Sequence, residues 1–100
     1  MQPELSSDQL TTVVRITDGA VRGSVADGVH VFYAIPYAAP PFGRNRLRPP
    51  QPVLPWRGIR DALTVGVMPP QLAYPPPWDR LIPERGSVGE DCLNLNIWTP

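Results

Sequence analysis

The sequence predicts a strand-based fold without long helices. Fifteen prolines and eight glycines are spread over 100 residues, so few uninterrupted stretches remain in which a long helix could form. Several short runs alternate apolar and polar residues with the period of two that is typical of strands. These two observations exclude a helical bundle and favour short antiparallel strands joined by tight turns and irregular, proline-rich connections.

The chain is expected to start with a flexible tail. Residues 1–11 are polar and show no apolar period, which places the folded region at residues 12–100. β-branched residues then dominate residues 11–16, and Asp18-Gly19 offers a tight turn after them. A β-hairpin is therefore predicted at the beginning of the folded region.

Two further strands are expected to follow this turn. Val21, Gly23 and Val25 alternate with polar residues up to a second turn sequence, Asp27-Gly28. The period of two then resumes across residues 29–33. The first third of the chain is thus predicted to form a meander of three short antiparallel strands.

Charge and composition exclude several classes of function. The formal net charge is zero and all nine positive charges are arginines, of which only Arg44, Arg46 and Arg48 form a cluster, so nucleic acid is not an expected partner. No apolar run is long enough to cross a membrane, and residues 1–8 lack the features of a secretory signal. With a single cysteine, Cys92, a cytoplasmic location is expected.

The sequence contains none of the usual catalytic or metal-binding motifs. It has no G-x-S-x-G nucleophile motif and no HGGG-type oxyanion motif. The single histidine, His30, is expected to be an ordinary strand residue. One cysteine and one histidine give no metal-ligand spacing, and without lysine there is no P-loop. We therefore predict no catalytic residue, no metal site and no cofactor within these residues.

A family resemblance rests on motifs that run through the chain in a consistent order. Residues 90–100 match the pattern E-D-C-L-x-L-N-I-W-x-P, residues 19–23 match G-x-V-x-G, and residues 32–43 match F-x-G-I-P-Y-A-x-P-P-x-G apart from Ala34 in place of glycine. Residues 46–52 resemble R-F-x-x-P-x-P. Trp56 and Asp61-Ala62 follow at the family's W and D-A positions. Together these motifs resemble the type B carboxylesterases, a family that includes the cholinesterases.

The resemblance implies an α/β fold, specifically the N-terminal portion of an α/β-hydrolase fold. It would comprise an antiparallel β meander, proline-rich loops and the first long strand of the central sheet, with Leu93, Leu95 and Ile97 on one face of that strand. Because alanine replaces glycine at position 34, the sequence predicts no positive φ angle there. In the family, such a fold hydrolyses small-molecule carboxylic esters through an acyl-enzyme on serine, without a cofactor.

The resemblance also assigns structural roles to three residues. Arg46 and Glu90 stand at the positions of an arginine and a glutamate that relatives join in an ion pair. Cys92 stands at the position of a cysteine that many relatives use in a disulfide. Proline occupies position 69, near the place of the usual partner, so Cys92 is expected to be a buried free thiol.

The loop between these positions is the part expected to approach a substrate. It holds Tyr74 and Trp78, and the run Pro75-Pro76-Pro77 predicts a stiff polyproline II segment. By resemblance this loop would form part of the substrate entrance, where Trp78 would either line an apolar pocket or only pack. Ile82 occupies the position of the tryptophan that meets the choline cation in cholinesterases, which argues against a quaternary ammonium substrate.

Two other functions remain open from the sequence. Some relatives keep this fold without the nucleophile, so the chain could belong to a non-catalytic, cholinesterase-like binding protein. The segment Arg46-Leu47-Arg48-Pro49-Pro50-Gln51-Pro52 also resembles a proline-rich ligand of SH3 domains. A G-x-S-x-G motif elsewhere in the protein would distinguish an esterase from such a binding protein. The oligomeric state is not predicted.

Overall fold

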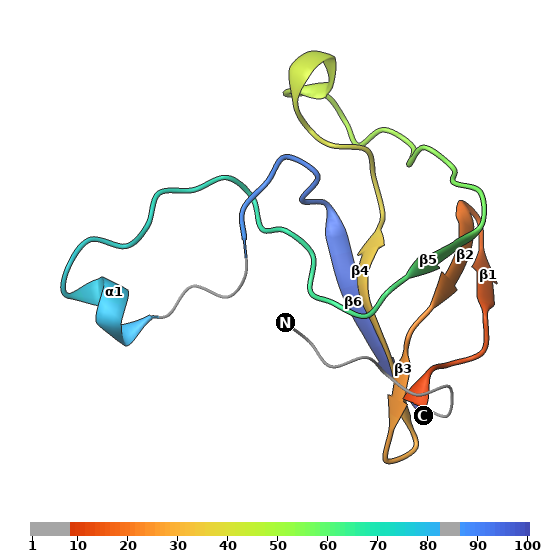
Figure 1. The fold of residues 1–100 in the computed structure, drawn as a ribbon. Helices are drawn as coiled ribbons and strands as arrows, with labels where there is room; N and C mark the ends of the chain where they lie inside the picture. Colours follow the sequence, from red (N-terminus) through yellow and green to blue (C-terminus); the bar gives the residue numbers. More distant parts are fainter. Residues whose placement is uncertain (1–8, 83–86) are drawn as a thin grey trace.

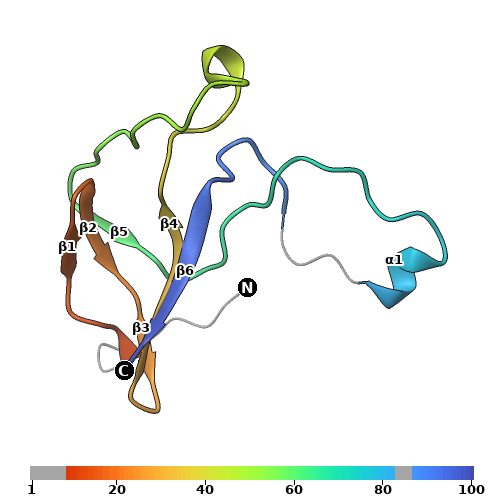
Figure 2. The same cartoon turned by 180° about the vertical axis from the view of Figure 1, so that it is seen from behind.

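Two small sheets form the body of the molecule. The computed structural model describes residues 9–82 and 87–100 (Figure 1). The first sheet has the order β1-β2-β5, and the second has the order β3-β4-β6. The strands are β1 (Val14–Ile16), β2 (Gly19–Arg22), β3 (Ser24–Ala26), β4 (Val29–Pro36), β5 (Ile59–Asp61) and β6 (Asn94–Thr99). A 3₁₀ turn, η2 (Gly43–Asn45), and a short helix, α1 (Trp78–Leu81), interrupt the connections, and Figure 2 shows both from behind.

The first hairpin forms as predicted, but its turn lies one residue earlier than expected. Strand β1 pairs antiparallel with β2, and Ile16 opposite Gly19 leaves Thr17 and Asp18 as the two turn residues. Gly19 is instead part of β2, where a Cβ atom would lie 2.4 Å from the ring of Trp56. The glycine is therefore required by close packing of this tryptophan, not by the turn.

The second hairpin confirms the Asp27-Gly28 turn. Ala26 pairs with Val29 across it, and the φ angles of Asp27 and Gly28 are +52° and +75°. Positive φ at both central residues is the conformation of a type I′ turn, whose twist matches that of the flanking strands.

The predicted middle strand divides into two strands at Gly23. Residues on its N-terminal side belong to β2 and those on its C-terminal side to β3, so the chain passes from one sheet to the other at this glycine. Thr11, which is buried, binds the crossing point: its Oγ1 accepts a hydrogen bond from the Gly23 amide at 2.9 Å. The Thr11 amide donates to the Gly23 carbonyl, also at 2.9 Å. The meander thus consists of four strands in two sheets instead of three strands in one.

The prediction about Ala34 was wrong, because its φ angle is +59°. Strands β4 and β6 pair with Phe32 opposite Ile97 and Ile35 opposite Leu95, so two residues of β4 face the single residue Asn96. This is a β-bulge, and the extra residue takes the left-handed conformation. The Asn96 side-chain oxygen accepts the Ala34 amide at 3.1 Å, which satisfies a group that the bulge removes from the ladder.

Replacing Ala34 by glycine is expected to raise the free energy of unfolding by about 1 kcal/mol. A left-handed conformation costs an L-residue with a Cβ atom roughly 1–2 kcal/mol, and glycine avoids most of that while remaining more flexible when unfolded. The measurement is urea unfolding of the complete protein, meaning the native gene product that contains residues 1–100. Ala39→Gly, at a position without a positive φ angle, is the control and should lower stability; an equal response of both variants would contradict the prediction.

The bulge also connects the two sheets. It frees the amide of Tyr33, which donates to the carbonyl of Ala62 at 2.9 Å, while the Ala62 amide donates to the carbonyl of Arg22 at 2.7 Å. Ala62 directly follows β5 and is 2% exposed. It packs with Val21, Phe32 and Ile35 in the central apolar cluster. One buried alanine therefore joins the first sheet to the second through its backbone and its methyl group.

Candidate functional site

The described residues contain no assembled catalytic or metal centre. Within residues 9–82 and 87–100, no three His, Cys, Asp or Glu side chains are grouped so that they could hold a metal ion. His30 lies on β4, as expected, where it pairs with Val25 and Thr99 and borders an apolar hollow. No helix in the described part of the chain has the length and apolar character needed to span a membrane.

An arm formed by residues 69–82, together with residues 87 and 88 at its base, carries the aromatic residues singled out in the sequence. It extends away from the two sheets in both views (Figures 1 and 2). Its base is closed by a parallel bridge between Met68 and Val88. There the Met68 amide donates to Ser87 at 2.8 Å, and the Gly89 amide donates back to Met68 at 2.9 Å. The backbone therefore fixes where the arm leaves the body.

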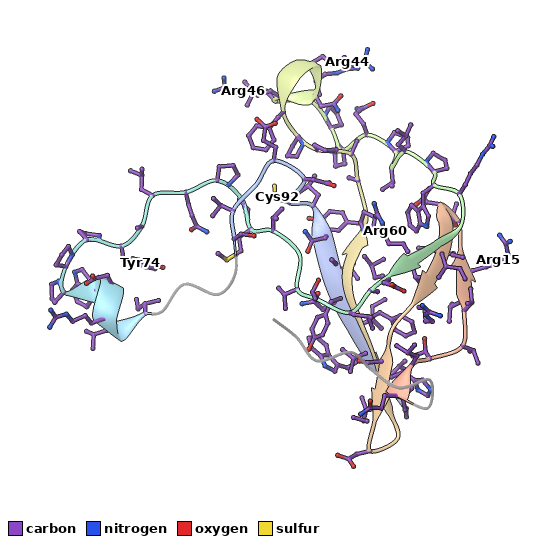
Figure 3. The ribbon with its side chains drawn as sticks, in the orientation of Figure 1. Arg15, Arg44, Arg46, Arg60, Tyr74 and Cys92 are labelled. Atoms are coloured by element: carbon purple, nitrogen blue, oxygen red, sulfur yellow. The ribbon has the colours of Figure 1, made fainter. Side chains whose placement is uncertain are left out.

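Tyr74 and Trp78 are both exposed on this arm, with 47% and 53% of their surface accessible. Tyr74 lies in the extended part and Trp78 begins α1 (Figure 3). Other large apolar side chains of the arm are exposed as well: Leu72, Leu81 and Ile82. The arm thus presents an apolar and aromatic surface, and a role of that surface at a substrate entrance stays a prediction.

The proline run of the arm does not continue as polyproline II. Pro77 has a ψ angle of 4°, far from the value near +145° of that conformation. The Trp78 amide instead donates to the Pro75 carbonyl at 2.9 Å, which closes a turn and leads into α1. The stiff extended segment expected from Pro75-Pro76-Pro77 is therefore replaced by a turn, because the start of α1 competes for the same residues.

Arg46 and Glu90 are not brought together among the residues that the structure describes. Arg46 follows η2, with its amide bonded to the Gly43 carbonyl at 3.1 Å, and its side chain points outward (Figure 3). Glu90 is also exposed. The ion pair found in the described part of the chain joins Arg22 and Asp61 at 3.1 Å. The pairing of Arg46 with Glu90 in the complete protein remains a prediction.

Replacing Arg46 by methionine is expected to lower the melting temperature of the complete protein by a few degrees. Methionine keeps much of the length of arginine but leaves the Glu90 carboxylate without its counterion, and an unpaired charge that is removed from water is unfavourable. Arg57→Met removes the same charge at another exposed position and serves as the control. Equal melting temperatures for Arg46→Met and the unsubstituted protein would refute the pair.

Cys92 is a free thiol that is half-buried (Figure 3). The expected burial of this thiol is only partial in the described chain, and its free state in the complete protein stays a prediction. Cys92 lies just before β6 and after the base of the arm. The backbone hydrogen bonds between Met68 and residues 87–89 close the arm at this place without a covalent bond.

The contacts of Asp61 and Trp56 became visible only in the structure. Asp61 pairs with Arg22 on the neighbouring strand, and Trp56 donates its indole N–H to the Ala20 carbonyl at 3.0 Å. The Arg60 guanidinium carbon lies 4.5 Å from the centre of the Trp56 ring, a cation–π contact. The positions of Trp56 and Asp61 in the family pattern are the signal that pointed to them, but that pattern does not reveal their partners.

Solved structures of esterases share this arrangement. A thermophilic pNB esterase superposes with a TM-score of 0.75 and 34% identity, over 88% of this chain and 18% of its own. A carboxylesterase of Geobacillus stearothermophilus gives a TM-score of 0.71 and 38% identity, over 90% of this chain and 16% of its own. The chain therefore has the fold of the N-terminal portion of an α/β-hydrolase, as predicted.

Sequence comparison identifies the family. The phenmedipham hydrolase of Pseudarthrobacter oxydans is 37% identical over 99 residues, which cover 88% of this chain and 18% of the relative. The cocaine esterase of Oryctolagus cuniculus is 36% identical over 103 residues, covering 93% and 19% respectively. The sequence profile of the carboxylesterase family matches residues 10–100. This chain belongs to the carboxylesterase family, and it spans less than one fifth of the length of these two relatives.

Proposed function

We propose that the complete protein hydrolyses carboxylic esters of small molecules, and that residues 1–100 form a structural and substrate-facing part of it. The match of residues 10–100 to the carboxylesterase family is the observation that carries this proposal. Hydrolysis would proceed through an acyl-enzyme on serine, with histidine as the base. Since residues 1–100 lack the G-x-S-x-G motif, these groups would have to come from another part of the protein.

The contribution of the described chain would be to hold β6 and the arm in fixed positions. β6 is anchored by β4 over its whole length, from Asn94 to Thr99. At the base of the arm, the Gly89 amide is bonded to the Met68 carbonyl, and Gly89 lies a few residues before this strand. Tyr74 and Trp78 would then offer aromatic surface to a substrate that approaches the arm.

The proposed substrates are small esters with apolar groups and without a quaternary ammonium group. The exposed side chains of the arm are aromatic or aliphatic at Leu72, Tyr74, Trp78, Leu81 and Ile82. An acetylcholinesterase of Bungarus fasciatus is 43% identical over 94 residues, but Ile82 provides no π face for a quaternary ammonium group. Relatives named for phenmedipham and cocaine support a broader class of small organic substrates.

A serine-reactive probe tests the proposal. The complete protein would be captured from its source with an antibody against residues 1–100 and treated with a fluorophosphonate. Labelling of one serine, together with hydrolysis of p-nitrophenyl esters that the probe abolishes, is the expected result. Binding of esters without labelling or turnover would replace the proposal with the non-catalytic binding protein. A captured product without either property would reject both.

The alternative that residues 46–52 form a ligand of SH3 domains has less support than the esterase function. SH3 ligands bind as polyproline II, which requires a negative φ angle at each residue. Leu47 has a φ angle of +61°, so the polyproline II conformation is interrupted inside the segment from Arg46 to Pro52.

The cytoplasmic location expected from the sequence stays a prediction. Fractionation of the source cells with the same antibody checks it.

A further inference from the structure

A hollow beside η2 is lined by arginine side chains that have no partner among the described residues. Its volume is about 430 Å³, within the range of small-molecule sites. Arg44 and Arg48 line it, and neither is paired with a carboxylate in the described part of the chain. Figure 1 shows η2 at one end of the molecule, away from the arm.

The surroundings of this hollow are positive. Residues 28–60 contain five arginines and no aspartate or glutamate, so no carboxylate of the adjoining chain neutralises Arg44 or Arg48. Arg46 lies between these two residues in the sequence but does not line the hollow, and its side chain points away from that of Arg44 (Figure 3). An anion that enters the hollow would therefore lie beside two arginines, whose guanidinium groups are well suited to bind a carboxylate or phosphate.

The rest of the wall combines apolar and polar residues and is held in place by hydrogen bonds. Four apolar residues share the lining with the polar residues Asn45 and Gln51: Ala39, Pro40, Pro52 and Leu54. The Ala39 amide donates to the Gln51 carbonyl at 2.9 Å, and the Asn45 side-chain amide donates to the Pro40 carbonyl at 3.2 Å. The first bond joins the two ends of the loop around the hollow, and the second holds η2 to the residues before it, so the wall is formed before a ligand binds.

We propose that this hollow binds an organic carboxylate whose anionic group lies between Arg44 and Arg48 and whose hydrocarbon part contacts the proline and leucine wall. The combination of two arginines with a wall that includes proline and leucine fits an amphiphilic anion better than it fits a bare oxyanion or a neutral apolar molecule. The inference stands independently of the proposed esterase activity, because the hollow lies on η2 and not on the arm.

Titration calorimetry with octanoate tests this site in the complete protein. The protein is first treated with the serine-reactive probe, so that a catalytic pocket, where one exists, is blocked. We expect saturable binding at one site that weakens as sodium chloride is added. Arg44→Gln with Arg48→Gln should weaken the affinity by at least about tenfold, since two charge-assisted hydrogen bonds are lost.

Matched controls separate this site from general charge effects. Arg15→Gln removes the same charge from an exposed position on β1 and should leave octanoate binding unchanged. 1-Octanol, which has a similar chain but no charge, should not compete. The proposal is overturned when the arginine double variant binds octanoate as tightly as the unsubstituted protein, or when 1-octanol or inorganic phosphate binds equally well. Equal melting temperatures of all variants show that folding is not the cause.

Discussion

Replacing Gly23 by alanine is expected to lower the free energy of unfolding of the complete protein by about 3 kcal/mol or more. A Cβ atom at this position would lie 2.1 Å from the carbonyl oxygen of Val31 and 2.9 Å from the ring of Phe32. The first of these is a backbone atom of β4 that cannot rotate away. The two sheets would have to separate at the point where the chain crosses between them, and the Thr11 hydrogen bonds to Gly23 would be disturbed.

Urea unfolding of Gly23→Ala and Gly28→Ala measures this effect. Gly28 has a φ angle of +75° but no atom within 4 Å of an added Cβ, so its variant reports the conformational effect alone, about 1 kcal/mol. We therefore expect Gly23→Ala to lower the free energy of unfolding much more than Gly28→Ala does. Equal losses in the two variants would mean that the close approach of Gly23 to β4 is not needed for stability.

Residues 1–100 produced alone are expected to unfold over a broad temperature range without a cooperative transition. The buried apolar core of the described residues consists of Ala20, Val21, Phe32, Ile35, Ala38 and Ala62, and no large side chain is fully buried. An apolar hollow of about 380 Å³ lies between the sheets and is bordered by Ile16, Phe32 and Ile97. So small a core gives little free energy to offset the conformational entropy that folding removes.

Strand β6 adds a second reason for this behaviour. It pairs with β4 at the end of the described sheet, so its other edge has no strand beside it. Leu95, Ile97 and Trp98 are 41%, 41% and 58% exposed on this strand. An unpaired edge with exposed apolar side chains favours association between chains. We therefore expect aggregation at micromolar concentration, which light scattering would detect.

Calorimetry and an NMR spectrum of ¹⁵N-labelled residues 1–100 check the prediction. A broad heat absorption with poorly dispersed amide signals is expected. A sharp, reversible transition with dispersed signals would show instead that the two sheets are stable by themselves.

Much of the local structure follows from the sequence because it depends on neighbouring residues. The Asp27-Gly28 turn is predictable since few residue pairs accept positive φ angles at both positions. The strand at β6 is predictable from the alternation of Leu93, Leu95 and Ile97 with polar residues. The family and its fold are predictable because several motifs occur in one order across most of the chain.

Other features depend on contacts between residues far apart in the sequence. Ala34 takes a positive φ angle because the Asn96 side chain, 62 positions away, accepts its amide in the bulge. Gly19 looks like a turn residue but is needed for the approach of Trp56. The proline run of the arm appears extended from composition alone, whereas the start of α1 makes it turn.

The sequence by itself determined that this protein is a member of the carboxylesterase family, with two hairpins in its first third and a strand just before Pro100, because these properties depend on local residue order. Only the tertiary structure decided that the chain divides into two sheets at Gly23, that Ala62 joins them, and that Arg22 pairs with Asp61. The physical reason is that these features depend on how separate strands lie relative to one another, which no short stretch of sequence specifies.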